Sequence, residues 1–189
     1  MNQFPIAKIT MENNDMIEIR LRPDQAPNTV KSFIWLASKG VYNGHSIQRI
    51  VPGYVLDASY TAFNHPDAKY LIPNESRCMG VENTLPVEPG YLCMGGYEIN
   101  QIAGGEFFFP FAYHEKLQGR YPAFGEVING WENIAKLEHI ELKPVPNDIG
   151  VEINEPITPV VIRSVEILNL QGPIEEPYKL SDPIPANWL

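Results

Sequence analysis

The segment GHSIQRIVPGYVLDAS, residues 44–59, places an arginine inside an alternating apolar run. Ile47, Arg49 and Val51 occupy every second position, so one face of a strand would carry all three side chains. A Pro-Gly pair interrupts the run, which then resumes as Tyr-Val-Leu. The pattern predicts a strand whose apolar face includes a guanidinium group, and charged side chains seldom lie among apolar ones unless they are paired.

The composition indicates a globular protein with one main domain. The chain has 189 residues and 44% of them are hydrophobic, which is enough for a core. No apolar run approaches the roughly 18 residues of a membrane span. The first residues, MNQFPIAKIT, lack the basic segment and apolar core of a secretory signal. We therefore expect a cytoplasmic monomer with no membrane partner.

Charge and ligand spacing exclude two further classes of protein. The formal net charge is −9 and no Lys/Arg cluster is present, so we expect no nucleic-acid partner. Cys78 and Cys93 lack metal-ligand spacing, and the histidines form no paired-ligand pattern, so we expect no metal. Two cysteines in a reducing compartment are expected to be free thiols.

The N-terminal part of the chain predicts a β-hairpin followed by a helix. Residues 7–10 and 16–21 are strand-like, and residues 12–15 between them are typical of a turn. Pro27 fits the first turn of a helix and Gly40 fits its end. Apolar residues recur between these two positions at helical spacing, namely Val30, Phe33, Ile34 and Ala37.

The middle of the chain predicts strands, loops and a second short helix. That helix is expected from Trp131 to about Leu137, with Ile134 and Leu137 facing inward. Residues 159–168 alternate and are expected to form the closing strand. Together these elements predict a mostly antiparallel β domain with two helices, either a barrel or a sandwich.

The C-terminal residues differ from the rest of the chain. From Gly172 onward the sequence holds four prolines and no periodicity. We therefore expect a domain of residues 1–171 and a proline-rich tail of residues 172–189, extended or draped on the domain.

Three segments together resemble one known family. In order and spacing they are similar to cyclophilin-type peptidyl-prolyl cis–trans isomerases, which read APKTVxNF, then RxIPGF, then GSQFF followed by VFGxV. The likeness extends over roughly residues 7 to 170. The segments are RPDQAPNTVKSFIWLASKGVYNG (22–44), IQRIVPGYVLDAS (47–59) and GGEFFFPFAYHEKLQGRYPAFGEVINGWENI (104–134).

The resemblance implies a fold and an activity. The expected fold is mainly β, a closed eight-stranded antiparallel cyclophilin-like barrel capped by two α-helices. The expected activity is isomerisation of X–Pro bonds in proline-containing peptides or unfolded protein clients, and the family uses no cofactor. One extra residue between Leu92 and Gly104 has to be accommodated.

By the same resemblance, Arg49 stands at the family's catalytic arginine. Isomerisation must break amide resonance, which gives a barrier of about 18–20 kcal/mol. A donor aimed at the prolyl nitrogen favours the twisted state, because only there is the nitrogen lone pair localised. A guanidinium group beside apolar walls suits this role, since it is always charged and rigid.

The resemblance also implies the substrate-binding residues. Phe108 takes the place of the aromatic floor of the proline slot, and Tyr121 replaces a histidine. Gly95, Gly96 and Tyr97 stand where the family holds the substrate backbone. The other positions carried over are Tyr54, Val55, Asp57, Glu106 and Leu117.

Several of these positions depart from the family pattern. Asp57 and Glu106 replace glutamines, and Lys116 replaces a tryptophan. A carboxylate forms charge-assisted hydrogen bonds with a guanidinium group. We therefore expect Arg49 to lie in the main pocket and to pair with Asp57, Glu106 or both.

Other interpretations stay open. Arg49 could be an ion-paired barrel residue, and the two carboxylates could act as an acid–base pair in hydrolysis, which no other residue supports. The altered site could also make the chain a binding module for proline-containing segments with little or no turnover. A scaffold role would depend on residues 172–189 alone.

Overall fold

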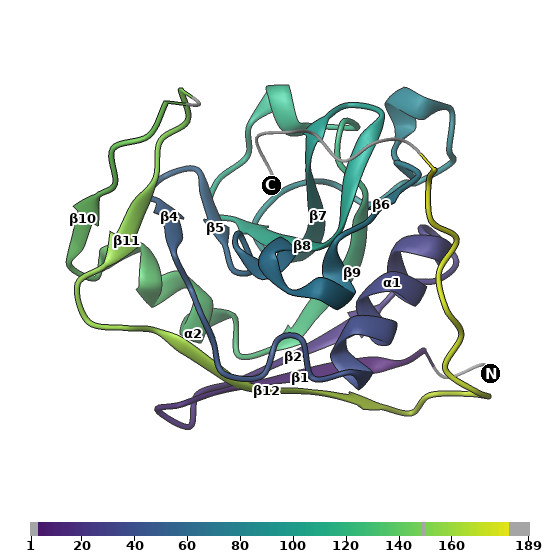
Figure 1. The fold of residues 1–189 in the computed structure, drawn as a ribbon, viewed down its shortest axis with the longest axis horizontal. Coiled ribbons are helices and arrows are strands. Elements are labelled where there is room, and N and C mark those ends of the chain that lie inside the picture. The colour runs from purple at the N-terminus through teal and green to yellow at the C-terminus, as the bar shows by residue number, and fades with distance from the viewer. Residues whose placement is uncertain (1–3, 149, 182–189) are drawn as a thin grey trace.

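The computed structural model describes residues 4–148 and 150–181, leaving aside the side chains of residues 97 and 98. Most strands belong to one curled antiparallel sheet, with α1 (Pro27–Ser38) and α2 (Trp131–Ala135) toward opposite ends (Figure 1). The order is β3 (His45–Ser46), β12 (Val161–Leu168), β1 (Ile6–Met11), β2 (Met16–Leu21), β9 (Ala123–Asn129), β7 (Tyr91–Glu98), β8 (Gln101–Pro110), β5 (Val55–Asp57) and β4 (Arg49–Val51). In addition, β6 (Leu71–Ile72) pairs with β8, and β10 (Leu142–Pro144) pairs with β11 (Asn154–Pro156).

The predicted hairpin is present as β1 and β2. Alternate side chains of both strands are buried, so one face of the hairpin packs on the core. Asn14 in the connecting turn has a φ of 71°, a conformation that asparagine tolerates better than most residues. The closing strand is β12, which pairs with β1 along its length.

The first helix also forms as predicted. It begins at Pro27, and the apolar residues spaced along it are buried. Its first turn is capped from a distance, because the Glu75 carboxylate accepts hydrogen bonds from the backbone N–H groups of Asn28 at 3.1 Å and Thr29 at 2.7 Å. After its last residue the chain reverses at Gly40, where φ is +71°.

The expectation of a closed eight-stranded barrel is wrong. The sheet is curled but open, since its end strands β3 and β4 form no ladder with each other in the described ranges. The outer edge of β4 instead faces the segment around β11. Asn154 Nδ2 donates to the carbonyl oxygen of Ile50 at 3.1 Å. The Asn154 side chain therefore hydrogen-bonds to a backbone carbonyl group that would otherwise be free to pair with a neighbouring strand.

The strand pattern around Arg49 also differs from the expected alternation. Ile47 lies between β3 and β4 and packs into the main core together with Ile50. Val51 belongs to a separate apolar cluster on the other face of the sheet. Because residues 47 and 48 interrupt the strand, Ile47 and Val51 do not share a face, and Arg49 lies on the side of Val51.

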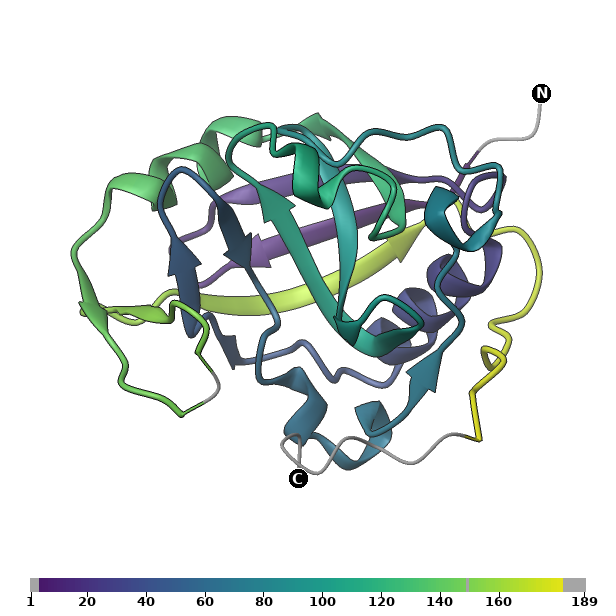
Figure 2. The same cartoon turned by 90° about the horizontal axis from the view of Figure 1, so that it is seen from above.

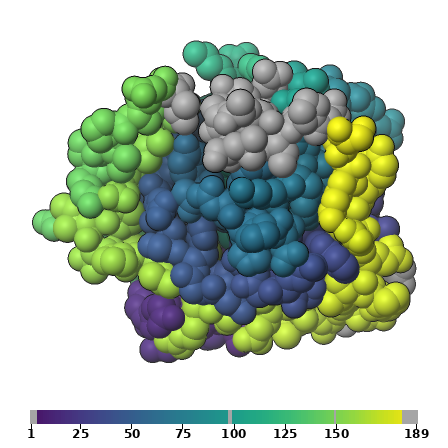
Figure 3. Space-filling view, in the orientation of Figure 1, coloured from purple at the N-terminus to yellow at the C-terminus, as the bar shows by residue number. Residues whose placement is uncertain are grey.

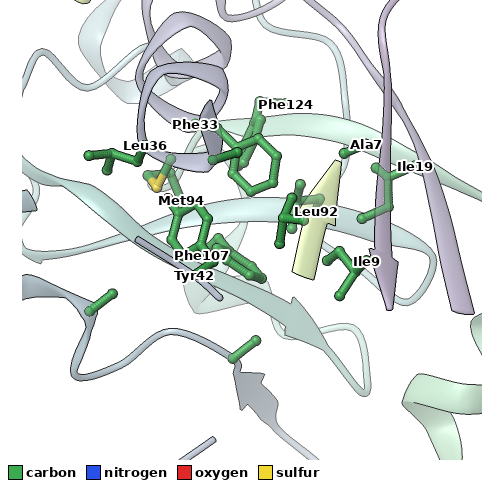
Figure 4. Packing of buried hydrophobic residues seen from close by; sticks show 14 of the residues in the cluster. Ala7, Ile9, Ile19, Phe33, Leu36, Tyr42, Leu92, Met94, Phe107 and Phe124 are labelled. Carbon is green, nitrogen blue, oxygen red and sulfur yellow. The ribbon is translucent and has the colours of Figure 1, made fainter. Parts of the chain in front are cut away.

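The main core lies between α1 and the sheet. The Phe33 ring from α1 stacks on Tyr42 at a centroid distance of 5.4 Å and meets Phe107 from β8 edge-on at 5.4 Å. Figure 4 shows these rings converging with Phe124 and Leu92. This packing fixes β8, the strand that carries several of the candidate site residues.

The second helix is shorter than predicted. It ends at Ala135 and continues as a 3₁₀ turn, Lys136–His139. Ile134 is buried, as expected, whereas Leu137 is only half-buried. None of the described helices has the length and apolar character needed to cross a membrane.

Residues 172–181 run extended along α1 and form neither helix nor strand (Figures 1 and 3). Asn28 anchors them, because its Nδ2 atom donates to the Tyr178 carbonyl oxygen at 3.0 Å and its Oδ1 atom accepts from Tyr178 N at 2.7 Å. Leu180 N donates to the Leu71 carbonyl oxygen of β6 at 2.8 Å. The rest of the predicted tail, residues 182–189, lies outside the described residues.

Candidate active site

The candidate site is a row of residues across four neighbouring strands. Arg49 on β4 is paired in register with Asp57 on β5, and Asp57 with Phe108 on β8. Phe108 is paired in turn with Cys93 on β7. Residues paired in this way lie on one face of a sheet, which we call the outer face. The inner face is the one that packs on the main core.

Two of the three guanidinium nitrogens of Arg49 are occupied. Nη1 donates to Asp57 Oδ2 at 3.2 Å, and Nε donates to the carbonyl oxygen of Glu152 at 2.9 Å. The guanidinium carbon lies 5.7 Å from the centroid of the Tyr60 ring. Nη2 has no hydrogen-bond partner among the described residues, so it is the nitrogen available to a ligand. The expected ion pair with Asp57 is therefore present.

Glu106 binds Asp57 rather than Arg49. It lies two residues before Phe108 on β8, and its carboxyl group is hydrogen-bonded to that of Asp57. Two carboxylates cannot bond without a proton, because neither has a donor. The Asp57 side chain is 6% exposed and Glu106 is half-buried, so the two carboxyl groups share a poorly solvated space.

The electrostatics assign the proton to Glu106. Desolvation and the neighbouring Asp57 charge raise the pKa of Glu106 well above its ordinary value. Desolvation also raises the pKa of Asp57, to about 6, against the opposing effect of the Arg49 charge. With the proton on Glu106, the row holds a guanidinium, a carboxylate and a neutral carboxylic acid, and the charges of Arg49 and Asp57 balance.

The glycines of β7 make room for this arrangement. A methyl group on Gly95 would lie 2.8 Å from Glu106 Oε1, and one on Gly96 would lie 2.4 Å from the carbonyl oxygen of Gln101. Both distances are too short for carbon, so a side chain at either position would displace a neighbour. Tyr97 follows these glycines, and its side chain lies outside the described part of the structure.

An apolar cluster lies beside the charged row on the outer face. Phe108 is part of it, whereas Phe107 and Phe109 face the main core. The Tyr121 ring meets Phe108 edge-on at 5.6 Å and is half-buried, as is Tyr54. Phe108 itself is 6% exposed, so the cluster is packed closely against its own members. The buried members are Val51, Val55, Leu85, Val87, Cys93, Phe108, Leu117 and Ala123.

The structure thus gathers Arg49, Asp57, Glu106 and Phe108 on one face, with Val55, Leu117, Tyr54 and Tyr121 around them. Lys116 lies apart, exposed on the 3₁₀ turn Glu115–Leu117. No group of His, Cys, Asp or Glu residues in the described ranges could hold a metal ion. Both cysteines are free thiols.

Two features of the site escaped the sequence reasoning. The first is the Glu152 carbonyl group, which accepts from Arg49 across 103 positions of the chain. The second is the location of the large cavity, of about 660 Å³, which lies behind the inner face. Arg49 does not line it, so the location of Arg49 in the main substrate pocket stays a prediction. Every residue has a main-chain carbonyl group, so no residue type in the sequence could identify the Glu152 contact. The cavity could not be predicted either, because its location depends on how the side chains pack.

Comparisons with known proteins agree on one family. The model of the family described as "Cyclophilin type peptidyl-prolyl cis-trans isomerase/CLD" matches residues 6–167. Peptidyl-prolyl cis-trans isomerase A of Dickeya dadantii is 27% identical over 164 residues, covering 80% of this chain and 79% of that protein. Peptidyl-prolyl cis-trans isomerase B of Bacillus subtilis is 31% identical over 125 residues, covering 65% of this chain and 82% of that protein.

Solved structures give the same fold. A cyclophilin-type isomerase from Cryptosporidium parvum superposes with a TM-score of 0.68 at 20% sequence identity, covering 90% of this chain and 99% of that one. A second structure of that protein, determined in the presence of the dipeptide Ala-Pro, gives a TM-score of 0.66 and covers 85% of this chain and 96% of that one.

Proposed function

Because the chain belongs to the cyclophilin-type peptidyl-prolyl cis–trans isomerases, we propose that it isomerises X–Pro bonds in peptides or proteins, with Arg49 as the catalytic residue. The observation that carries this proposal is the position of the guanidinium group. It lies on the outer face next to the apolar cluster, with Nη2 unoccupied among the described residues.

The chemistry needs one donor and one apolar surface. The proline ring packs against Phe108 and its neighbours Val55 and Leu117, while Nη2 of Arg49 donates to the prolyl nitrogen as the amide twists. In the planar amide this nitrogen has no available lone pair, so the hydrogen bond favours the twisted state over the ground state. The donor is already oriented by Asp57 and Glu152, so little reorganisation is needed during the reaction.

The remaining residues position the substrate. Backbone groups of Gly95, Gly96 and Tyr97 bind the substrate main chain, and Tyr54 and Tyr121 form the rim of the apolar cluster. The Cryptosporidium structure determined in the presence of Ala-Pro supports a proline-containing ligand for this fold. No step requires a cofactor.

A second candidate function is a binding module with little turnover. The close packing of the apolar cluster favours it, since Phe108 is only 6% exposed and a proline ring must open the cluster to enter. Two guanidinium nitrogens are also already bound. This alternative predicts binding of X–Pro peptides without acceleration of isomerisation.

A protease-coupled assay on a panel of X–Pro peptides separates the two functions. We expect the wild-type chain to accelerate isomerisation and Arg49→Ala to remove most of that activity. Arg163→Ala is the matched control, because Arg163 is exposed on β12 and pairs with Glu12 instead. Peptide binding measured by calorimetry without any acceleration would favour the binding module.

A further inference from the structure

A cavity of about 660 Å³ lies behind the strands that carry Arg49 and Asp57. Its walls are the inner faces of the hairpin β1–β2 and of strands β5 and β8, closed at one end by α2 and the turn that follows it. Close packing normally leaves interior voids no larger than a water molecule. Apolar residues that represent the three walls are Ile9, Ile17, Leu56, Phe107, Phe109 and Ile134.

The short second helix explains why the space is unfilled. α2 has five residues, of which only Ile134 is buried, so the helix inserts one large side chain into the end of the sheet. On the opposite wall Ala58 contributes a single methyl group. The volume lies within the range of about 300–1,000 Å³ that is typical of small-molecule sites. It is several times the roughly 150 Å³ of an apolar cavity known to bind benzene.

The described residues that line the cavity leave no buried side-chain polar atom without a hydrogen bond. Four buried side-chain atoms lack a hydrogen bond in the described residues, and none of them belongs to a residue that lines the cavity. A water molecule needs two or more polar partners to occupy such a space. An apolar molecule meets no such requirement, and it gains free energy by leaving water.

Several polar groups at the rim are already paired, and His139, Glu141 and Thr158 complete its polar lining. The ammonium group of Lys136 forms an ion pair with Asp15 and donates to Asn133 Oδ1 at 3.2 Å. Asn133 Nδ2 donates to the Met16 carbonyl oxygen at 3.0 Å, and Glu12 lies 3.7 Å from Arg163. These paired groups therefore do not require a charged group on the ligand.

We propose that this cavity is a binding site for a neutral, mostly hydrocarbon molecule, such as a hydrocarbon chain or fused ring system with at most a hydroxyl or carbonyl group at the rim. The site is distinct from the one around Arg49. Leu56 faces the cavity, while its neighbour Asp57 faces outward, and Phe107 and Phe109 alternate with Phe108 in the same way.

The test uses a matched pair of fluorescent probes. N-phenyl-1-naphthylamine is neutral, and 1-anilinonaphthalene-8-sulfonate carries a sulfonate on a similar ring system. We expect saturable binding of the neutral probe with a stoichiometry of one and at least tenfold weaker binding of the anionic probe. The neutral probe should also raise the midpoint of thermal unfolding, because it binds only the folded chain.

Two variants locate the bound probe. Ala58→Leu fills the cavity from its wall, and Leu137→Trp narrows it from the half-buried rim. Each should weaken binding of the neutral probe at least tenfold while circular dichroism stays unchanged. Leu168→Trp is the matched control, since Leu168 is exposed on β12 and does not line the cavity. It should bind like wild type.

Three results would overturn the proposal: wild type without saturable binding, unchanged affinity in both cavity variants, or displacement of the probe by an X–Pro peptide that competes for the Arg49 site. If Ala58→Leu fails to fold, nuclear magnetic resonance of the wild-type chain gives a second measurement. Shifts induced by the neutral probe should then concentrate on the methyl groups of Ile9, Leu56 and Ile134, and shifts confined to Val55 and Leu117 would contradict the proposal.

Discussion

Arg49 and Asp57 face each other on adjacent strands, with Nη1 and Oδ2 separated by 3.2 Å and both side chains largely buried. The pair explains how a guanidinium group can lie among the apolar residues around Arg49, because a buried guanidinium group requires a charged partner. A carboxylate partner also competes with a substrate for the donors of Arg49. The predicted behaviour of the site follows from this competition.

Replacing Arg49 by alanine should lower kcat/KM by on the order of 10²–10³, because the reaction loses a preorganised donor. The fold should survive, since Asp57 can take up a proton once its partner is absent. Protease-coupled kinetics test the activity and circular dichroism tests the fold. An Arg49→Ala variant with full activity would place catalysis elsewhere.

Changing both Asp57 and Glu106 to glutamine should raise kcat/KM. Neutral amides can still orient Arg49, but they hold its donors less strongly than a carboxylate does. Weakening one charged hydrogen bond by about 1 kcal/mol corresponds to about fivefold in rate. The measurement compares kcat/KM of the double variant with wild type, with unfolding midpoints measured in parallel.

The two single glutamine variants show which carboxyl group causes the expected increase in kcat/KM. Glu106 is the protonated member of the pair, so Glu106→Gln changes little charge and should leave kcat/KM within about twofold. Asp57→Gln should carry nearly the whole gain. Lower activity of Asp57→Gln at equal stability would mean that the carboxylate positions Arg49 productively.

Both carboxyl groups predict a dependence of stability on pH. The pKa of Asp57 rises from 3.8 to about 6 on folding, and the pKa of Glu106 rises well above its ordinary value. An acid whose pKa is raised by folding binds more protons in the folded state. Its stabilising contribution is therefore complete below pH 4 and is lost as pH rises through the folded pKa. For Asp57 this loss is on the order of 3 kcal/mol.

Denaturant unfolding between pH 4 and pH 8 measures this contribution. We expect the double glutamine variant to lose less stability over that range than wild type, because it lacks both titrating groups. Activity should change in the same direction as stability, because protonation of Asp57 near pH 6 releases Arg49 for the substrate. Wild-type kcat/KM should then rise from pH 7 to pH 5, and the same rise in the double variant would refute the assignment.

Periodicity and motif spacing predicted the parts of the fold that depend on local sequence. The hairpin β1–β2 and helix α1 have apolar residues at fixed intervals, so their buried faces could be identified. The open sheet could not be predicted in the same way, because it depends on which groups reach the edge of β4. Asn154 reaches that edge from 104 positions away, and no local pattern encodes such a contact.

The sequence predicted those parts of the candidate site that are formed by side chains. Arg49, Asp57 and Phe108 share a row because their spacing along β4, β5 and β8 fixes the register. The protonation of Glu106 was not predictable from the sequence. It depends on the burial of two carboxyl groups that the strand register brings together. Ile47 was assigned to the wrong face, because a two-residue break resets the alternation before β4.

The last prediction concerns the hairpin β10–β11, which contacts Arg49 through a main-chain carbonyl group and not through a side chain. The hairpin projects from the side of the sheet where β4 lies (Figure 2). Glu152, just before β11, accepts from Arg49 Nε, and Asn154 fastens the segment to Ile50. We expect these contacts to position Arg49, so that loosening the hairpin misaligns its free nitrogen.

Asn154→Ala should therefore lower kcat on the order of tenfold while KM changes little, because a misplaced donor affects the twisted state more than the bound ground state. Lys143→Ala is the control, since it removes the ion pair between Lys143 and Glu155 within the same hairpin, at 2.7 Å, and leaves the hydrogen bonds to Arg49 and Ile50 in place. That variant should retain wild-type kcat. Equal kcat in Asn154→Ala and wild type, with unfolding midpoints that match, would show that Asp57 alone is enough to orient Arg49.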